Sequence, residues 1–283
     1  MNSSSSIKPQ TMVNPPPDQD LLLVDVHAHL DHELFKNDLA QVLDQGQAAG
    51  LKAVITNGTN PASNEAVLAL AKRFPIIKVA LGLYPIDALG LAPDTDGLPH
   101  PGTPINVDHS IEYISEHKHE IAAIGEVGID YKFDKDQHDI QKKNFEKIIA
   151  LSEKIKRPMI IHSRGAEADV VAMLESSRVK SAVLHCFSGN KKLIKRAADQ
   201  GLYFSIPATI VKSQHFQMLV SMVPTSQLLT ETDSPWLGLV IGERNVPQNV
   251  RFSIEHIAQI KGLDMHEASM MVYKNYLDLF GTP

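Results

Sequence analysis

The sequence has little with which to build a disulfide framework, a membrane span or a basic surface. Cys186 is the single cysteine among 283 residues, so no intrachain disulfide can form, and a reducing cytoplasm is the expected compartment. No apolar run reaches the roughly 18 residues that cross a bilayer, and the N-terminus lacks the apolar core of a signal peptide. Basic residues number 27 against 33 acidic ones, a net charge of −6. This balance argues against a generally basic nucleic-acid-binding surface, although a local basic groove or a metal ion could still hold a phosphate.

The first twenty residues differ in composition from the rest of the chain. Residues 1–20 are rich in serine, proline and other polar residues, which bury too little apolar surface to offset the entropy lost on ordering. We expect a disordered N-terminal tail there. In the whole chain 43% of the residues are hydrophobic, enough for one large core, so residues 21–283 are predicted to form a single domain.

Short apolar runs recur along residues 21–283, and a helix-like amphipathic stretch follows each of them. Most of the runs are apolar throughout, as is typical of strands that are covered on both faces. Eight such strands alternating with helices over about 260 residues predict a closed (β/α)₈ TIM barrel of the α/β class. The predicted strands are Leu21–Val26, Ala53–Thr56, Ile76–Leu81, Ile121–Gly125, Pro158–Ile161, Ala182–Leu184, Leu202–Ser205 and Gln227–Thr230.

A doubly wound open sheet is the alternative architecture. It would carry a glycine-rich phosphate-binding turn after the first strand, but Asp25-Val26-His27-Ala28-His29 stands there, which favours the barrel.

Two segments interrupt the alternation of strands and helices. Gly90–Val107, rich in proline and glycine, is predicted to be a long loop, either on the active face of the barrel or as an inert insertion, with His100 as a solvated side chain. Trp236–Pro247 is predicted to be a second irregular stretch.

Polar residues end the apolar runs at the carboxyl ends of the predicted strands. In a barrel these ends surround one mouth, where the reactive groups of this fold gather. One histidine at a strand end would be weak evidence, because such residues often serve as structural hydrogen-bonding groups, but packing does not explain six polar residues at five strand ends. The six candidate metal ligands are His27, His29, Glu126, His162, His185 and Asp233.

The types and positions of these ligands suit a pair of divalent cations. His27 and His29 are one residue apart on an extended strand end, so both rings point to the same side and can bind one ion. Glu126 can bridge two ions through its two oxygens, and His162 and His185, from adjacent strands, can complete the second site. Two cations about 3.5–4 Å apart would lower the pKa of a bridging water and stabilise an anionic transition state.

Five segments of the chain carry a family resemblance. They are Asp25-Val26-His27-Ala28-His29-Leu30, Gly125-Glu126-Val127-Gly128-Ile129-Asp130-Tyr131, Pro158–Arg164, Leu184-His185-Cys186-Phe187-Ser188-Gly189 and Glu231-Thr232-Asp233-Ser234-Pro235-Trp236. Together they resemble the TatD-type metal-dependent deoxyribonucleases of the amidohydrolase superfamily, and the resemblance runs from Leu21 to Gly281. It implies a TIM barrel with a one- or two-metal centre that hydrolyses DNA phosphodiesters with a cation such as Mg²⁺. The implied ligand sets are His27, His29, Glu126 and Asp233 for one ion, and Glu126, His162 and His185 for the other.

Two segments depart from the pattern of that family. Members similar to the bacterial nuclease carry Gly-x-His-Pro after the third strand, with the histidine near the substrate phosphate, whereas this chain has Gly82-Leu83-Tyr84-Pro85. Tyrosine donates one hydrogen bond but cannot carry the charge of an imidazolium. The Asn-Glu-Pro of the family appears as Asn245-Val246-Pro247, without its carboxylate. Both changes concern substrate binding more than metal ligation, so hydrolase chemistry is better supported than DNA as the substrate.

The predicted mechanism assigns catalysis to two carboxylates. Asp233 would cap the first ion and orient or deprotonate the attacking water, with Glu126 as the second catalytic residue. Arg164 or Tyr84 would stabilise the developing negative charge, and Arg244 is a further candidate for substrate binding. Arg164 could instead serve only to balance the charge of the carboxylates at the mouth.

Three classes of function are compatible with these residues. The first is a phosphodiesterase that acts on the 3′ end of DNA, because single strands or frayed ends fit a barrel mouth better than intact duplex. The second is an amidohydrolase-like deacylase that acts on an ester or amide, for example an aminoacyl-RNA, or on a small lactone. The third is a non-catalytic barrel that binds a partner, and the intact ligand set argues against it.

We expect the first of these functions, in a cytoplasmic monomer that binds DNA or other nucleic-acid ends and no membrane. The predicted cofactors are one or two divalent cations per chain. The resemblance points to Mg²⁺, while four histidines with two carboxylates suit Zn²⁺ or Mn²⁺ by ligand chemistry.

Overall fold

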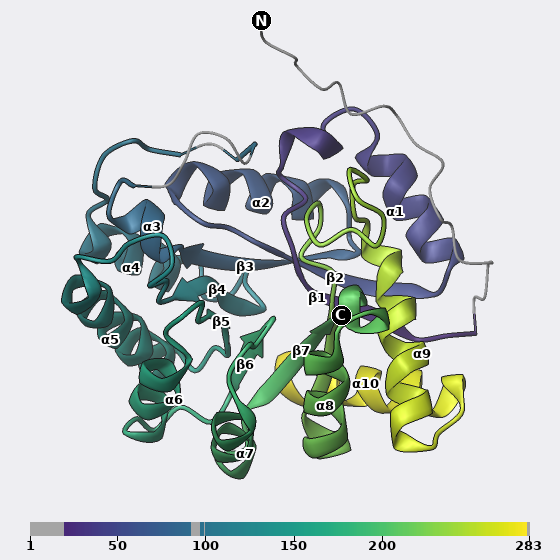
Figure 1. Cartoon of the computed structure of the whole chain (residues 1–283). Helices are drawn as coiled ribbons and strands as arrows, with labels where there is room; N and C mark the ends of the chain where they lie inside the picture. Colours follow the sequence, from purple (N-terminus) through teal and green to yellow (C-terminus); the bar gives the residue numbers. More distant parts are fainter. Residues whose placement is uncertain (1–19, 92–96, 99, 282–283) are drawn as a thin grey trace, which may run out of the picture.

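The computed structural model describes residues 20–91, 97–98 and 100–281, and eight parallel strands run through its centre (Figure 1). Each strand pairs with the next one in the sequence, so the order in the sheet is the order in the chain. The strands are β1 (Leu23–Ala28), β2 (Leu51–Asn57), β3 (Ile77–Leu83), β4 (Ala123–Gly128), β5 (Met159–His162), β6 (Ala182–His185), β7 (Tyr203–Pro207) and β8 (Leu228–Glu231).

The sheet closes on itself where β1 meets the end of β8. Ala28 and Ser234 form a parallel bridge, and the backbone N–H of Asp233 donates to the carbonyl oxygen of His27 at 2.8 Å. The N–H of His29 returns a bond to the Ser234 carbonyl, also at 2.8 Å. This closure, which follows from the parallel order of the strands, confirms the predicted (β/α)₈ TIM barrel over the open-sheet alternative.

All eight predicted strands are present, with shifted ends. Each predicted strand ends one to three residues before the observed strand, and in most strands the added residues include a buried polar side chain. The first strand was predicted as Leu21–Val26, but β1 extends to Ala28 and so includes His27, which is fully buried. The side chains at these extensions face the barrel mouth, and the strand ends therefore carry the site.

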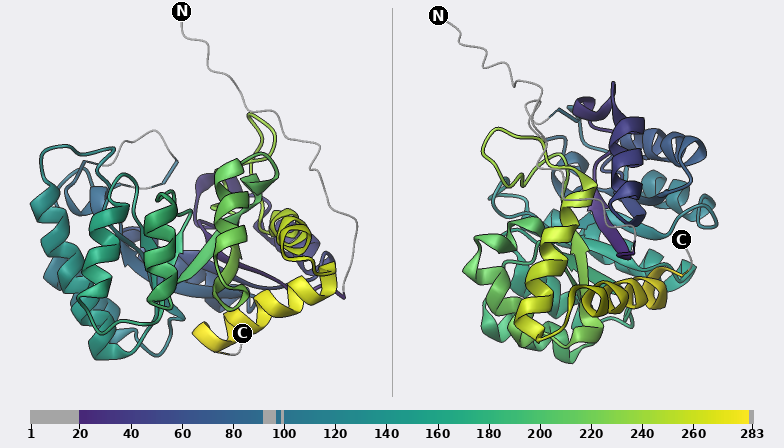
Figure 2. Two further views of the ribbon diagram at one scale, coloured as in Figure 1. Left: turned by 60° about the horizontal axis from the view of Figure 1, so that its bottom comes forward. Right: turned by 90° about the vertical axis from the view of Figure 1, so that its right-hand side faces the viewer.

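Helices cover the outside of the barrel (Figure 2). In the described part of the chain they are α1 (Leu39–Ala48), α2 (Pro61–Arg73), α3 (Pro85–Ala88), α4 (Val107–Glu116), α5 (His138–Ile155), α6 (Glu167–Glu175), α7 (Lys191–Asp199), α8 (Gln214–Met222), α9 (Val250–Lys261) and α10 (Met265–Phe280). Short 3₁₀ turns are η1 (Glu33–Phe35), η2 (Ala208–Val211), η3 (Thr225–Gln227) and η4 (Pro247–Asn249). None of the helices described is long and apolar enough to cross a membrane.

The last helix packs against the end of the barrel opposite the mouth. Asp264 and Glu267 form a capping box that begins α10. The Asn275 amide of this helix donates to the Leu228 carbonyl at 2.8 Å, at the first residue of β8. Helix α10 therefore covers the amino ends of β8 and β1, while the polar strand ends lie at the opposite end of the barrel.

The two irregular segments lie near the mouth. The described residues of Gly90–Val107 form neither strand nor helix until α4 begins. Residues 92–96 and 99 of this segment lie outside the described part of the chain, as do residues 1–19 of the predicted N-terminal tail. Leu98 and His100 of this segment line the cavity above the strand ends, which supports the active-face interpretation over an inert insertion. Trp236–Pro247 is irregular until η4, as predicted.

Candidate metal centre

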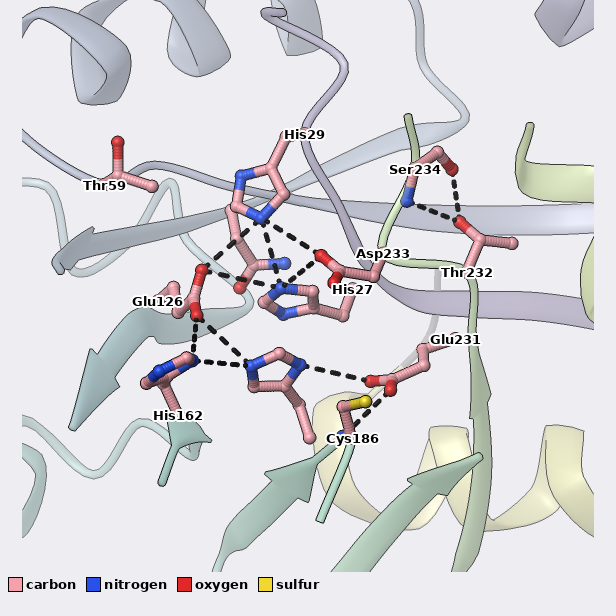
Figure 3. A network of polar contacts seen from close by, with 12 residues as sticks. His27, His29, Thr59, Glu126, His162, Cys186, Glu231, Thr232, Asp233 and Ser234 are labelled. Atoms are coloured by element: carbon pink, nitrogen blue, oxygen red, sulfur yellow. Dashed lines mark hydrogen bonds and ion pairs between the residues drawn. The ribbon is translucent and has the colours of Figure 1, made fainter. Parts of the chain in front are cut away.

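The end of β1 brings two imidazoles together with their ring planes at 79° to each other. The Nε2 atoms of His27 and His29 are 3.2 Å apart. Glu126 Oε2, from β4, lies 3.6 Å from the first nitrogen and 3.4 Å from the second. Asp233 Oδ1, just after β8, lies 3.5 and 3.6 Å from the same two nitrogens. We call these four residues cluster A (Figure 3).

The second oxygen of Glu126 belongs to another group of ligands. Oε1 lies 2.8 Å from His162 Nδ1 on β5 and 3.2 Å from His185 Nε2 on β6. The two ring nitrogens are themselves 3.2 Å apart. These three residues are cluster B, so Glu126 is shared between the clusters, as the sequence interpretation expected of a bridging carboxylate.

The atoms of both clusters suit divalent cations in chemistry and spacing. A cation with bonds of about 2.0–2.1 Å to tetrahedral ligands separates those ligands by about 3.3 Å. The nitrogen–nitrogen contacts of 3.2 Å and the nitrogen–oxygen contacts of 3.4–3.6 Å in cluster A are close to that value. Two ring nitrogens that face each other can share only one proton, whereas a cation uses the lone pairs of both. The residues present therefore fit a metal centre.

Buried carboxylates orient the histidines of cluster B from behind. His162 Nε2 lies 2.8 Å from Asp130 Oδ2, which leaves its Nδ1 for the cluster. His185 Nδ1 lies 3.6 Å from Glu231 Oε2, and the other Glu231 oxygen accepts the Cys186 N–H at 2.8 Å. The contact with Asp130 fixes the His162 ring and its tautomer, whereas the 3.6 Å separation at His185 is longer than a hydrogen bond and only places a negative charge behind that ring. Sequence reasoning gave Asp130 and Glu231 no role, although both lie in the family motifs. Asp130 lies four residues after Glu126, and Glu231 lies two residues before Asp233.

Two glycines allow the backbone to approach this closely. A Cβ on Gly82 would lie 2.3 Å from the Glu126 nitrogen and 2.4 Å from its carbonyl oxygen. Gly128 has a φ of +140°, and a Cβ there would lie 2.0 Å from the His162 carbonyl oxygen. Larger residues at either position would displace Glu126 or His162.

Asp25 stabilises the seam of the barrel beneath cluster A. It accepts hydrogen bonds from the Thr232 hydroxyl and N–H and from the His27 N–H at 3.1 Å. Burial raises the pKa of this carboxyl despite those hydrogen bonds. Asp25 therefore fixes the backbone that carries His27 and Asp233. Its described hydrogen bonds go to backbone N–H groups and to the Thr232 hydroxyl, and none goes to an imidazole ring.

The electrostatics of the clusters favour ionised carboxylates. Burial alone would raise the pKa of Glu126, but hydrogen bonds from His162, His185 and His29 outweigh it and hold the pKa well below its usual range. Burial likewise disfavours the charged forms of His162 and His185, yet their carboxylate partners raise both pKa values. Without a cation the centre therefore retains protons on cluster B, and a cation must displace them.

A cavity of about 360 Å³ opens above both clusters. The side chains of Tyr84 and Arg164, two of the predicted substrate-binding residues, line it. The Tyr84 hydroxyl donates to Asp130 Oδ2 at 3.1 Å, and burial raises the pKa of this phenol, so it stays protonated. Arg164 Nε lies 3.7 Å from the same carboxylate oxygen, and 45% of its side chain is exposed.

Arg244, the third predicted substrate-binding residue, does not line this cavity. Its guanidinium binds both oxygens of Asp38, at 2.9 and 2.7 Å, and lies over the Phe35 ring at 4.7 Å from the centroid. This arrangement connects the β8–η4 segment to the turn before α1.

The expectation that His100 is solvated is wrong. Its side chain is 3% exposed, and its Nδ1 lies 2.6 Å from Oδ1 of the buried Asp87. The other Asp87 oxygen accepts from the Asn60 amide at 2.8 Å. A long proline-rich loop suggests solvent exposure, and nothing in the local sequence of His100 signals a carboxylate partner in α3.

A closed α/β barrel with histidine and carboxylate clusters at its mouth is the architecture of a metal-dependent hydrolase. The chain belongs to the TatD related DNase family, whose model matches residues 24–281. It is 31% identical over 263 residues to human deoxyribonuclease TATDN3, covering 91% of this chain and 94% of that protein. It is 30% identical over 265 residues to YabD of Bacillus subtilis, named an uncharacterized metal-dependent hydrolase, covering 92% and 99%.

A solved structure shares the fold. The crystal structure of YJJV, a TatD homolog from Escherichia coli K12, superposes with a TM-score of 0.80 at 24% identity, covering 93% of this chain and all of that one. Family membership confirms the resemblance drawn from the motifs and the expectation of a metal-dependent hydrolase.

Proposed function

We propose that this protein is a deoxyribonuclease that removes nucleotides from the 3′ end of DNA, with divalent cations held by clusters A and B. The observation that carries the proposal is the position of Glu126, whose two oxygens face two separate pairs of imidazoles. The name of the human relative, a deoxyribonuclease, supports DNA as the substrate.

The proposed ligands are the six residues at the strand ends. When bound, two cations would polarise a phosphoryl oxygen and lower the pKa of the attacking water. Imidazole and carboxylate donors suit Zn²⁺ or Mn²⁺, and Mg²⁺ is the ion that the family resemblance indicates.

Asp233 is the proposed proton acceptor. Burial would raise its pKa, but the hydrogen bond and charge of His27 lower it, so the carboxylate is ionised near neutral pH. It can accept the proton of the water as that oxygen bonds to phosphorus. As the bond between phosphorus and the leaving 3′ oxygen breaks, Asp233 returns the proton to that oxygen, which leaves a shortened strand and a nucleoside monophosphate.

The size of the cavity favours a strand end over a duplex. Its volume of about 360 Å³ is at the lower end of the roughly 300–1,000 Å³ that small-ligand pockets span. One terminal nucleotide fits such a space, and Arg164 at its edge is the proposed cation for the phosphate. Tyr84 borders the same space and is proposed to donate its one hydroxyl hydrogen to the phosphate in exchange for its bond to Asp130. We propose no substrate contact for Arg244, because Asp38 already binds its guanidinium.

The test uses single-stranded and 3′-overhang oligonucleotides labelled at either end, incubated with Mg²⁺, Mn²⁺ or Zn²⁺. We expect a ladder of shortened products that retain the 5′ label. Glu126→Gln should lose bound metal and at least about a hundredfold in rate while the far-ultraviolet circular dichroism spectrum stays unchanged. Failure of the wild-type protein to shorten any strand, together with hydrolysis of an aminoacyl-RNA ester, would establish the deacylase instead.

The same preparation tests the remaining proposals. All six ligands come from one chain, which supports a monomer that is complete without a partner. Light scattering after gel filtration would measure the mass, elemental analysis would identify the metal, and fractionation of cells would test the proposed cytoplasmic location.

A further inference from the structure

An aromatic side chain stands exposed at the cavity that holds the metal clusters. Phe133, in the turn between β4 and α5, lines this cavity, yet it is 53% exposed. Among the described residues it is the one Phe, Tyr or Trp that is mainly open to solvent. Trp236, which also lines the cavity, differs because its ring packs edge-on against His29 and His32.

The position of Phe133 is fixed relative to the metal ligands. Its N–H donates to Asp130 Oδ1 at 3.0 Å, and the other oxygen of the same carboxylate lies 2.8 Å from His162 Nε2. The guanidinium carbon of Arg164 lies 5.2 Å from the centroid of the Phe133 ring. One carboxylate thus places an aromatic ring, a cation and a metal ligand beside one another.

We infer that Phe133 is a stacking platform for the base of the terminal nucleotide. This inference rests on the proposed function, because it names how the same site holds its substrate. Every base offers a π-face to an aromatic ring, so stacking on an exposed aromatic side chain contributes to the binding of single strands whatever their sequence. Arg164 would hold the phosphate while the base lies on Phe133, which leaves the phosphodiester over the clusters.

The platform predicts a specific pattern of kinetic change. Phe133→Ala should raise KM for a strand with a 3′-terminal purine by about 5- to 150-fold, because a stacked base contributes that factor to binding. The kcat should change little, since stacking is equal in the bound substrate and the transition state. Phe133→Trp should keep a low KM. Ile140→Ala, which removes another exposed apolar side chain from the nearby helix α5, is the matched control and should have no effect.

A second substrate separates stacking from a change in structure. For a strand whose 3′-terminal residue is an abasic tetrahydrofuran, Phe133→Ala and wild type should have the same KM, because no base is present to stack. An equal loss on both strands, or no loss on the purine strand, would overturn the inference.

A binding measurement keeps the inference testable if the chain cleaves no DNA. A strand that ends in 2-aminopurine should lose fluorescence when it is mixed rapidly with metal-loaded wild-type protein, before the strand is shortened. Its fluorescence should not fall with Phe133→Ala. Absence of turnover with intact quenching would reject the proposed function and retain the platform for nucleic-acid ends. Equal quenching by both proteins, or none by either, would reject the platform.

Discussion

The side chain of Asp130 determines which nitrogen of His162 is available to a cation. Its Oδ2 lies 2.8 Å from His162 Nε2 and accepts the Tyr84 hydroxyl at 3.1 Å. Its Oδ1 accepts the backbone N–H groups of Lys132 and Phe133, at 2.8 and 3.0 Å. All four partners are donors or can act as donors, so only a carboxylate satisfies every one of them.

Asp130→Asn replaces one acceptor with an NH₂ group while preserving shape. The amide oxygen will face the two backbone N–H groups, because the reverse orientation would set the NH₂ against two donors that cannot reorient, whereas the Tyr84 hydroxyl can rotate and the imidazole can change tautomer. The NH₂ then faces His162 Nε2, which must accept, so the ring proton moves to Nδ1. That atom is the one 2.8 Å from Glu126 in cluster B, and a protonated nitrogen cannot bind a cation.

The loss of a charged hydrogen bond of about 1.5–3 kcal/mol sets the scale of this effect. It corresponds to about 10- to 100-fold weaker binding of the cation in cluster B, the range found for residues that orient metal ligands. Cluster A should keep its affinity within a few-fold, because His27 and His29 have no contact with Asp130 among the described interactions.

Metal content and competition titration against a chelator would measure the change. The matched control is Asp134→Asn in the same turn, because Asp134 accepts the N–H groups of Asp136 and Gln137 and touches no ligand histidine. The tautomer argument would be refuted if Asp130→Asn bound two equivalents of metal with the affinity of the wild-type protein. An equal loss in both variants would assign the effect to the turn.

Two more predictions concern protons and stability. His162 and His185 keep raised pKa values in the metal-free protein, so cation affinity should increase as the pH rises above about 6.5, with proton release in calorimetry. The protonated histidines also stabilise the metal-free protein, so its Tm should fall over the same pH range. A cation affinity that does not change with pH would contradict both expectations. His100→Ala removes a partner of buried Asp87 and should reduce the free energy of unfolding by about 1–3 kcal/mol in denaturant titration. Exposed His109→Ala is its control, and equal stability of the two variants would exclude the pair as a stabilising contact.

The strands and the ligands at their ends could be predicted for one physical reason. Strands that are covered on both faces must be apolar along their length, so a histidine or carboxylate at the end of each run is conspicuous. In a parallel barrel all carboxyl ends meet, and residues as distant as His27 and Asp233 can be assigned to one site without any contact information.

Apart from Glu231 at the end of β8, the contacts that sequence reasoning missed lie where no periodic pattern constrains the backbone. Asp130 follows β4 in a turn, and its orientation toward His162 depends on the path of that turn. The contact of Arg244 with Asp38 joins positions that are 206 residues apart in irregular segments. Turns and long loops leave direction undetermined, so the supports of the site appear only in three dimensions.

The charges around the mouth determine the order in which cation and substrate bind. With the imidazoles neutral, as coordination requires, the carboxylates of Glu126 and Asp233 line the cavity with Asp130 beside them, and Arg164 is the one guanidinium among the described residues that line it. Tyr84 stays protonated and adds no charge. A DNA end brings further negative charge into this region, which is unfavourable until two divalent cations contribute four positive charges. We therefore expect the cations to be needed for binding of a DNA end as well as for its hydrolysis, so that removing them with a chelator abolishes both.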